Sequence, residues 1–526
     1  MFRPYLLASP PLIHSVMTCM NGGNMRGKTA VVLGGSVAGL CAAGVLARHF
    51  DEVIVLERDR LPPDAQHRRG VPQSKHPHFL LNSGRRAIGE IFPGFEDALI
   101  AAGGMCLMPS MDAAYCEHAG WAPRKAGSMT MIYSSRVLIE RVLRDKVREL
   151  PAIEIREGVT VTGLRSTGGG TARGRVEGVE YRAGDVSGHL SADLVVDALG
   201  RGSSVADWLS AAGWPAPPEK TLDAKVTYTS RWYDLPPADR RPPAWWWKHL
   251  VVTPTQDTGD HPEEHEFLSN FFPIEGDRAI VCMGAWGIRM PREVDTFEAA
   301  VDRVRASSFG RATRACTPTS GVHLTRSTGN KWRRFDLLDQ PPLGLVCVGD
   351  SICAFNPFYA QGMSSAARSA LILAEMLHGH DVLDLAFFRE FLTRQKKSLD
   401  VPWMLAMARD QAYDFATGSE VVAPWRRKLA ARLSWPVFNA INATSREDAY
   451  VERTFAQVFN LDMSLREMTT DVRFWFGIAR YKVRQRLGRT VVPGGFDDQQ
   501  DPPGTDFTGL TRAGSSPYAE TDLVND

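Results

Sequence analysis

A short apolar segment followed by a glycine-rich turn constrains this chain of 526 residues more than any other feature. Residues 28–33 form a β-branched run typical of a buried parallel strand, and residues 34–39 (GGSVAG) lead into a small-residue helix over 40–48. A second apolar strand, 52–56, ends at Glu57. This strand–turn–helix–strand order, ending in an acidic residue, is the fingerprint of a dinucleotide-binding βαβ unit.

Each position of the turn has its own physical task. Gly34 permits the tight turn, and Gly39 lets the helix pack closely on the strand. Ser36 replaces the glycine that usually lets the backbone approach a pyrophosphate. The helix N-terminus would hold the phosphates, and Glu57 would accept hydrogen bonds from ribose hydroxyls. The candidate cofactor-binding residues here are Gly34, Ser36, Val37, Ala38, Gly39, Glu57 and Arg58.

Two other interpretations of the turn stay open at this point. It could be an α/β turn that binds nothing. It also nearly spells a nucleophile elbow, which would make Ser36 the nucleophile of a serine hydrolase with Asp350 and His378 as partners. The hydrolase interpretation leaves Glu57 and the later glycine motifs unexplained.

Two further strand ends carry a glycine beside a carboxylate. The apolar run 192–197 ends in Asp197 before Gly200, and the run 343–349 ends in Gly349-Asp350. A turn over 351–363 then leads into a small-residue helix over 364–377. A carboxylate at a strand end is a natural partner for sugar or ribityl hydroxyls, although Asp350 could instead be a helix N-cap.

Composition narrows the class of protein. The 61 Lys and Arg balance 60 Asp and Glu, so no nucleic-acid partner is expected. The eight cysteines show no zinc-ligand spacing, so we expect no metal site and reduced thiols in a cytoplasmic protein. Residues 29–47 are apolar but rich in glycine, which predicts strand–turn–helix and no transmembrane segment. Residues 1–25 are expected to be a flexible extension, and 490–526 a disordered tail.

In this order and separation, the three segments resemble the single-component FAD-dependent monooxygenases of the aromatic hydroxylase fold. The stretches 69–73 (RGVPQ), 76–81 (HPHFLL), 135–140 (SRVLIE), 332–335 (WRRF) and 355–363 (FNPFYAQGM) more closely resemble the polyether-antibiotic epoxidases of the monensin and lasalocid type. The resemblance implies FAD, with NADH or NADPH as reductant and O2 as co-substrate. It also implies Arg136 near the phosphate–ribityl portion, the Val159 backbone at adenine, and Asp350 at the ribityl–pyrophosphate region. Pro357, Gly362 and Met363 would line the flavin ring.

The same resemblance shows where this chain departs from the pattern. Ala360 stands where relatives usually have glycine, and Leu199 replaces a small polar residue. His76 and His78 would lie near the flavin, or would be loop histidines bonded to backbone. The tryptophans 245–247 invite comparison with flavin halogenases, but we interpret them as packing of the substrate domain.

The predicted fold is α/β: a Rossmann-like FAD-binding domain of the glutathione-reductase type, an antiparallel β-sheet substrate domain and a C-terminal helical region. The expected boundaries are 26–205 and 335–395 for the FAD domain, 206–334 for the substrate domain and 396–489 for the helices. The expected function is epoxidation or hydroxylation of a lipophilic substrate of secondary metabolism through a flavin C4a-hydroperoxide. The flavin would carry that chemistry, so no catalytic side chain is nominated. A polyprenyl or alkene reductase, a flavin halogenase and a flavin-binding protein without turnover are the alternatives on this fold.

Overall fold

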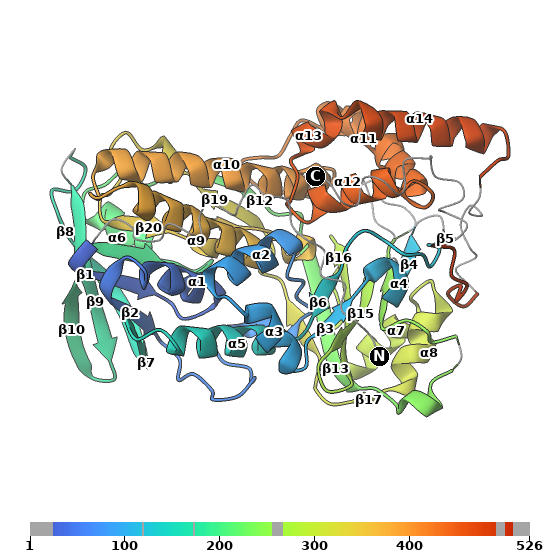
Figure 1. Ribbon diagram of the computed structural model, residues 1–526, viewed down its shortest axis with the longest axis horizontal. Helices are drawn as coiled ribbons and strands as arrows, with labels where there is room; N and C mark the ends of the chain where they lie inside the picture. The colour runs from blue at the N-terminus through green and yellow to red at the C-terminus, as the bar shows by residue number, and fades with distance from the viewer. Residues whose placement is uncertain are drawn as a thin grey trace.

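The computed structural model describes residues 25–117, 120–171, 174–242, 244–254, 267–490 and 500–508. The extension predicted over 1–25, apart from Met25, and most of the tail predicted over 490–526 lie outside these residues. The described chain combines a parallel sheet covered by helices, a larger mostly antiparallel sheet, and a group of C-terminal helices (Figure 1). The predicted α/β architecture is therefore confirmed.

Five parallel strands form the centre of the first half, in the order β20-β11-β1-β2-β7. They are β1 (Met25–Leu33), β2 (Phe50–Glu57), β7 (Ile153–Glu157), β11 (Leu194–Asp197) and β20 (Leu345–Cys347). Successive side chains of β1 alternate between two apolar layers, because Ala30 and Val32 belong to one hydrophobic core and Val31 and Leu33 to another. A strand buried on both faces explains the continuous apolar run in the sequence.

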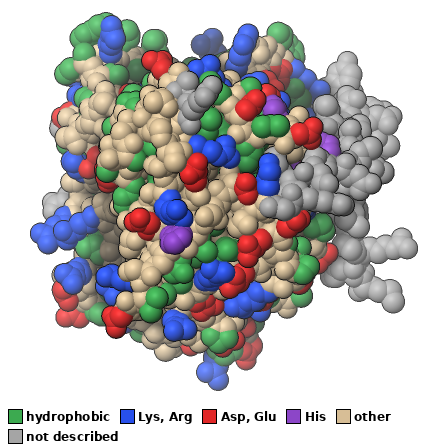
Figure 2. Space-filling view, turned by 90° about the vertical axis from the view of Figure 1, so that its left-hand side faces the viewer, with side chains coloured by type: hydrophobic (Ala, Val, Ile, Leu, Met, Phe, Trp, Pro, Cys, Tyr) green, Lys and Arg blue, Asp and Glu red, His purple; other side chains and the backbone are tan. Residues whose placement is uncertain are grey.

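Helices cover one face of this sheet and a small antiparallel sheet covers the other (Figure 1). The helices of the first layer are α1 (Val37–Leu46), α2 (Asn82–Ile91), α3 (Phe95–Ala101), α5 (Arg136–Arg148) and α9 (Gly362–Gly379), and α10 (Leu385–Asp410) packs on α9. The opposite layer consists of β8 (Val159–Thr167), β9 (Arg175–Ala183) and β10 (Val186–Ser191). At the end of the molecule formed by β8–β10, acidic and basic side chains are interspersed (Figure 2).

The second half is built on an eight-stranded sheet, in which β18 pairs with β13 beside the order β17-β13-β16-β15-β14-β4-β5. Its strands are β4 (Ala113–Glu117), β5 (Gly120–Trp121), β13 (Val226–Asp234), β14 (His249–Val252), β15 (Leu268–Ile274), β16 (Arg278–Trp286), β17 (Thr317–Pro318) and β18 (His323–Thr325). All pairs are antiparallel except β14 with β4. Because β4 and β5 precede α5 in the sequence, the chain enters this sheet twice.

Shorter elements connect these layers, and four helices follow α10 in the described part of the chain. The shorter ones are β3 (Met105–Leu107), α4 (Pro109–Asp112), β6 (Met131–Tyr133), α6 (Val205–Ala211), β12 (Glu219–Leu222), α7 (Val294–Asp302), α8 (Ser307–Ala315), β19 (Asn330–Arg333) and β21 (Cys353–Ala354). After α10 come α11 (Pro424–Ser445), α12 (Ala449–Phe459), α13 (Leu465–Thr470) and α14 (Val472–Arg486). None of the described helices has the length and apolar character needed to cross a membrane.

Candidate cofactor site

The glycine-rich turn after β1 has the geometry that its sequence predicts. Gly34 adopts φ +101°, and its N–H donates a hydrogen bond to the Leu56 carbonyl at 2.9 Å. A Cβ on Gly34 would lie 2.7 Å from the Ala198 carbonyl oxygen, and one on Gly39 would lie 1.8 Å from the Gly34 carbonyl oxygen. Both glycines are therefore required for α1 to start directly above the strand ends.

Glu57, at the end of β2, folds back over this turn. One carboxylate oxygen accepts a hydrogen bond from the Gly35 N–H at 2.8 Å, and the other accepts from the Asp59 N–H at 2.9 Å. The Glu57 residue is only 4% exposed, whereas Arg58 beside it is exposed. Glu57, the predicted ribose acceptor, thus lies directly beside the glycine-rich turn that is predicted to bind phosphate.

Arg136 is the first residue of α5, whose N-cap Ser135 accepts a hydrogen bond from the Leu138 N–H at 3.2 Å. The buried Arg136 guanidinium donates to the Ser36 hydroxyl at 2.8 Å, which brings α5 to the glycine-rich turn. Its Nη1 is buried and has no hydrogen-bond partner within the described part of the chain. A buried cationic donor without a partner is costly, so this nitrogen suits an anionic group such as a phosphate.

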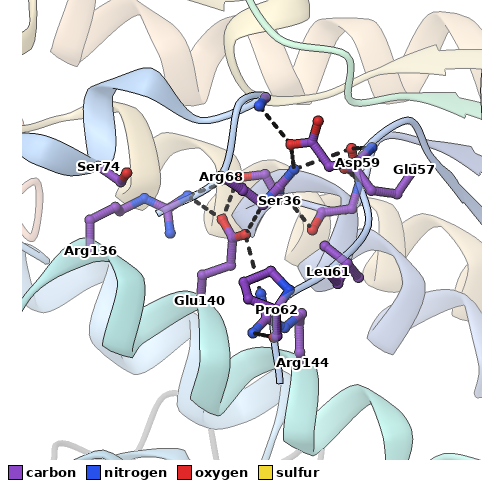
Figure 3. A network of polar contacts seen from close by, with 12 residues as sticks. Ser36, Glu57, Asp59, Leu61, Pro62, Arg68, Ser74, Arg136, Glu140 and Arg144 are labelled. Atoms are coloured by element: carbon purple, nitrogen blue, oxygen red, sulfur yellow. Dashed lines mark hydrogen bonds and ion pairs between the residues drawn. The ribbon is translucent and has the colours of Figure 1, made fainter. Parts of the chain in front are cut away.

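Arg68 and Glu140 complete a buried ion-pair network that the sequence reasoning missed (Figure 3). Arg68 pairs with Glu140 at 2.7 Å, Asp59 at 2.9 Å and Glu57 at 3.2 Å. Burial alone would raise the pKa of Glu140, but Arg136 and Arg68 outweigh it and hold that pKa below its usual value. One signal was available, because Glu140 follows Arg136 by one helical turn and therefore shares its face.

The Gly-Asp segment after β20 meets the same turn from the other side. Gly349 adopts φ +65°, and a Cβ there would lie 2.7 Å from the Ala38 side chain in the first turn of α1. Asp350 follows, half-buried, with one carboxylate oxygen 3.5 Å from the position a Gly362 Cβ would take. Burial raises the pKa of Asp350, and Arg201 and Arg136 act to lower it. The structure therefore brings Asp350 to the region of Arg136 and the glycine-rich turn.

The turn that precedes α9 is anchored to the buried Asp410 carboxylate, which accepts a hydrogen bond from the Asn356 side chain at 3.1 Å. Asn356 caps the short helix Pro357–Tyr359 by accepting from the Phe358 N–H at 3.2 Å, and Ala360 follows with φ +56°. Gly362 begins α9, and Met363 packs partly buried against the helix core. The Gln361 Oε1 is buried without a hydrogen-bond partner among the described residues, so the start of α9 also offers an unused polar atom.

Val159 lies at the start of β8, directly after Gly158 with φ +73°. The Gly158 N–H donates to the Asp59 carbonyl at 3.3 Å, so the Val159 backbone begins beside the end of β2. Of the predicted site residues, those around Gly34, Glu57, Arg136 and Asp350 are therefore brought together at the strand ends. Leu199, the other departure from the family pattern, donates its N–H to Asp197 within the turn after β11 at 3.0 Å.

The two loop histidines are hydrogen-bonded to protein. His76 Nδ1 lies 2.8 Å from the Ser230 hydroxyl, and His78 Nδ1 lies 2.9 Å from the His76 carbonyl. Burial lowers the pKa of His76 to about 3 and that of His78 to about 4, so both rings are neutral at physiological pH. The described residues contain no group of three or more His, Cys, Asp or Glu side chains that could hold a metal ion.

The serine-hydrolase alternative lacks its histidine. The Ser36 hydroxyl donates to Glu140 at 2.9 Å and accepts from Arg136, and the structure gives it no contact with an imidazole among the described residues. His378 is exposed near the C-terminal end of α9, whereas Asp350 lies at the N-terminal end of that helix. The triad geometry that this chemistry needs is not formed.

Trp245 stacks on Trp247 at 5.0 Å within the core of the second sheet, as the packing interpretation predicts.

The site fits the cofactor that the resemblance implies. A glycine-rich turn at a helix N-terminus, the unpaired Arg136 Nη1 and the unused Gln361 Oε1 are polar features that an elongated dinucleotide with a flavin head would satisfy.

Together, the parallel sheet with its glycine-rich turn, the Gly-Asp segment and the large antiparallel sheet give the chain a fold that it shares with solved flavin-dependent enzymes. No protein-family model matches the chain. It is 29% identical over 415 residues to Protein Rv3254 of Mycobacterium tuberculosis, a match covering 76% of this chain and 83% of that protein.

Among solved structures, it resembles the flavin-dependent brominase Bmp2 with a TM-score of 0.57 and 14% identity, over 88% of this chain and 100% of that one. It also resembles PqsL of Pseudomonas aeruginosa, described as a probable FAD-dependent monooxygenase, with a TM-score of 0.52 and 18% identity. That match covers 74% of this chain and 94% of PqsL.

Proposed function

We propose that the protein is an FAD-dependent monooxygenase that uses NADH or NADPH and O2 to epoxidise or hydroxylate a small organic molecule. The observation that carries the proposal is the packing of Gly349 against Ala38, because it brings the Gly-Asp segment to the phosphate turn. Fold similarity to flavin-dependent enzymes of two chemistries supports a flavin site in general. The polyether-epoxidase subtype and a role in secondary metabolism belong to this proposal as predictions.

The chain's own residues would bind and orient the cofactor. The α1 N-terminus and the turn at Gly34 allow a close approach of pyrophosphate, and Arg136 Nη1 supplies a charge-assisted donor. Glu57 retains acceptor capacity for a ribose hydroxyl, since a carboxylate offers about four lone-pair sites and Gly35, Asp59 and Arg68 use three. Asp350 would accept a hydrogen bond from the ribityl chain.

Bound FAD would pass two electrons from the reduced nicotinamide to O2, so that one oxygen atom enters the substrate and the other leaves as water. The protein's contribution to such a step is to position the substrate and to keep water away. Tyr228, Phe358 and Trp286 form an aromatic wall beside the turn that starts at Pro357, with ring centroids 5.5 Å and 5.0 Å apart. Such a wall limits the access of water to that side of the site.

The site assignment is tested by flavin content. Asp350→Ala should purify with most of its FAD lost, because the strand-end carboxylate is removed while the fold is kept. Asp381→Ala, an exposed aspartate beyond the far end of α9, is the matched control and should keep its flavin. The ratio of flavin to protein absorbance gives the result, and full flavin content in Asp350→Ala would show the assignment to be wrong.

The reaction class is tested on the purified, flavin-loaded protein. A monooxygenase consumes O2 together with NAD(P)H when a substrate is added, and an oxygen atom appears in the product. Substrate-stimulated NAD(P)H oxidation without oxygen uptake would instead indicate an alkene reductase. No stimulation by any of a panel of alkenes and phenols would favour a flavin-binding protein without turnover.

A further inference from the structure

A cavity of about 460 Å³ lies between the loop that carries His76 and the edge of the second sheet at β18. Its polar lining comes from Lys75, His76, Arg292, His323 and Arg326, and the rest of the lining is apolar. This volume is in the range of pockets that hold small organic ligands, roughly 300–1,000 Å³. Three separate stretches of the chain contribute these side chains, so the fold assembles the pocket.

The charge of this cavity is one-sided. Lys75, Arg292 and Arg326 line it, and the described residues contribute no carboxylate to its lining. Across the described residues, no ion pair within 4.0 Å links any of these three cations to an acidic side chain. By contrast, Arg68, Arg85 and Arg231 elsewhere in the molecule are each paired with a carboxylate. Arg292 and Arg326 are exposed and Lys75 is half-buried. Three cations without an acidic partner among the described residues, placed around one hollow, produce a positive potential that attracts an anion.

Burial and the positive charge around the cavity both lower the pKa of two nearby histidines, His323 and His67. Burial lowers the pKa of His323, and the charges of Lys75 and His67 lower it further. Burial likewise lowers the pKa of His67, and the charges of Lys75 and Arg278 lower it further. No carboxylate is among the causes for either ring. An anion would therefore be stabilised by the permanent charges of lysine and arginine, while the neutral rings would supply hydrogen-bonding edges.

The cavity is one aromatic ring away from the turn that starts at Pro357. The His76 ring packs edge-on against Tyr228 with centroids 4.6 Å apart, and Tyr228 lies 5.5 Å from Phe358. His76 is also tied to β13 through the Ser230 hydroxyl at 2.8 Å. Direct ring contacts therefore connect the lining of the cavity, through His76 and Tyr228, to that turn.

We propose that this cavity binds the carboxylate of an organic acid, and that the substrate is an amphipathic acid with its oxidisable carbon away from the charged end. The identification of the bound acid as the substrate rests on the proposed function. It replaces the purely lipophilic substrate expected from the sequence by an acidic one. The phosphates of NADH or NADPH present related oxygen-anion chemistry. A carboxylate is favoured because part of the lining, at β18, belongs to the sheet of the expected substrate domain, and because His76 of the lining contacts the aromatic ring of Tyr228.

Calorimetric titration of the flavin-loaded protein tests this inference, with cinnamate and decanoate as probes and their primary amides as neutral partners. The cavity variant is the double substitution Lys75→Gln and Arg326→Gln. The charge-matched control is Lys428→Gln and Arg432→Gln, two exposed cations on α11. Each preparation is also checked for flavin absorbance, thermal stability and the KM for NADPH.

At least one acid should bind roughly tenfold more tightly than its amide, a preference that equals about 1.4 kcal/mol. The preference should weaken with added salt and disappear in the cavity variant, but not in the control. Equal binding of acid and amide, binding of neither, or a preference that survives in the cavity variant would overturn the inference. A cavity variant with a raised KM for NADPH and unchanged acid binding would assign the cations to the reductant instead. Because the calorimetric readouts do not require turnover, loss of the monooxygenase proposal would show separately, as absent flavin or absent oxygen uptake.

Discussion

The hydroxyl of Ser36 donates a hydrogen bond to the Glu140 carboxylate across 2.9 Å and at the same time accepts one from Arg136 at 2.8 Å. This contact ties the first turn of α1 to α5, although the residues are far apart in the sequence. Glu140 also lies 2.7 Å from Arg68, 3.3 Å from Arg136 and 3.7 Å from Arg144, so one buried carboxylate serves three guanidinium groups (Figure 3). The glycine-rich turn is thus held to α5 by the buried charged network around Glu140.

Removing that carboxylate should be costly. Glu140→Ala leaves the buried cations around it without their shared partner, and breaking a buried pair in this way costs about 3–5 kcal/mol. Urea unfolding of the purified protein measures the change. Glu149→Ala is the matched control, because Glu149 is an exposed carboxylate at the C-terminal end of the same helix and pairs only with Lys146 at the surface. Its effect should stay within about 0.5 kcal/mol. If both variants lose a similar free energy of unfolding, the buried network around Glu140 contributes no more to stability than a surface ion pair does.

The two helical glycines Gly39 and Gly89 should respond oppositely to the same substitution. In Gly39→Ala the new methyl group would lie 1.8 Å from the Gly34 carbonyl oxygen, so backbone must move, at a cost of about 3 kcal/mol or more. Gly89 in α2 has no atom within 4 Å of a Cβ, and Gly89→Ala should stabilise by about 0.5–1 kcal/mol through helix propensity. Thermal unfolding with flavin content recorded in parallel distinguishes them, and a Gly39→Ala protein as stable as the parent would contradict close helix–strand packing.

The parts of this structure that follow from local pattern were predictable from the sequence. The β1–α1–β2 unit and the helix starting at Arg136 depend on residues within one or two turns of each other. The contacts of Glu140 with Arg68, and the cavity lined by Lys75, Arg292 and Arg326, join residues from distant segments. Their side chains are ordinary surface types in a sequence, so only the fold reveals which of them lie together. The entry of β4 into the second sheet was missed for the same reason, since a parallel pairing with β14 depends on topology.

Stability should fall as the pH drops below about 6.5, and His249 should contribute to this fall. Burial lowers the pKa of His249 to about 4, with the hydrogen bond to Asn270 acting in the opposite direction. As the pH falls, the unfolded chain therefore binds a proton at His249 before the folded protein does. The contribution of His249 to stability is lost as the pH falls from about 6.5 to about 4, and it is unchanged at higher pH. The slope from this one group is about 1.4 kcal/mol per pH unit. His249→Gln should flatten the profile in this range, whereas His189→Gln, at an exposed histidine of β10, should leave it unchanged. Urea unfolding across the range decides, and an identical slope in His249→Gln would contradict the argument.

Asp410 should be required to hold the turn before α9. Its fully buried carboxylate accepts hydrogen bonds from Tyr359 at 2.6 Å, Asn330 at 2.7 Å, Trp286 at 3.0 Å and Asn356 at 3.1 Å. Asp410→Asn replaces one acceptor oxygen by a donor that would face other donors. Leaving buried donors unsatisfied costs about 1–3 kcal/mol each. We expect a loss of about 3 kcal/mol together with reduced FAD content. Asp400→Asn, on the same helix but paired with Lys396 at the surface, should change neither quantity. A stable, flavin-replete Asp410→Asn protein would show that the turn holds its shape without this carboxylate.

Ala360 offers a test of whether the departure from the family pattern carries strain. It adopts φ +56°, a left-handed conformation that costs a residue with a Cβ about 1–2 kcal/mol and glycine almost nothing. Glycine also gains freedom in the unfolded chain, which offsets part of the benefit, so Ala360→Gly should stabilise by up to about 1 kcal/mol. Ala238→Gly, at an exposed alanine in the short helix Ala238–Arg240, has no such strain to relieve and should destabilise by about 0.5–1 kcal/mol. Chemical unfolding of the two variants beside the parent gives the sign of each change. If Ala360→Gly lowers stability as much as Ala238→Gly does, then surrounding contacts of the methyl group outweigh the strain, and the alanine is favoured at this position of the turn.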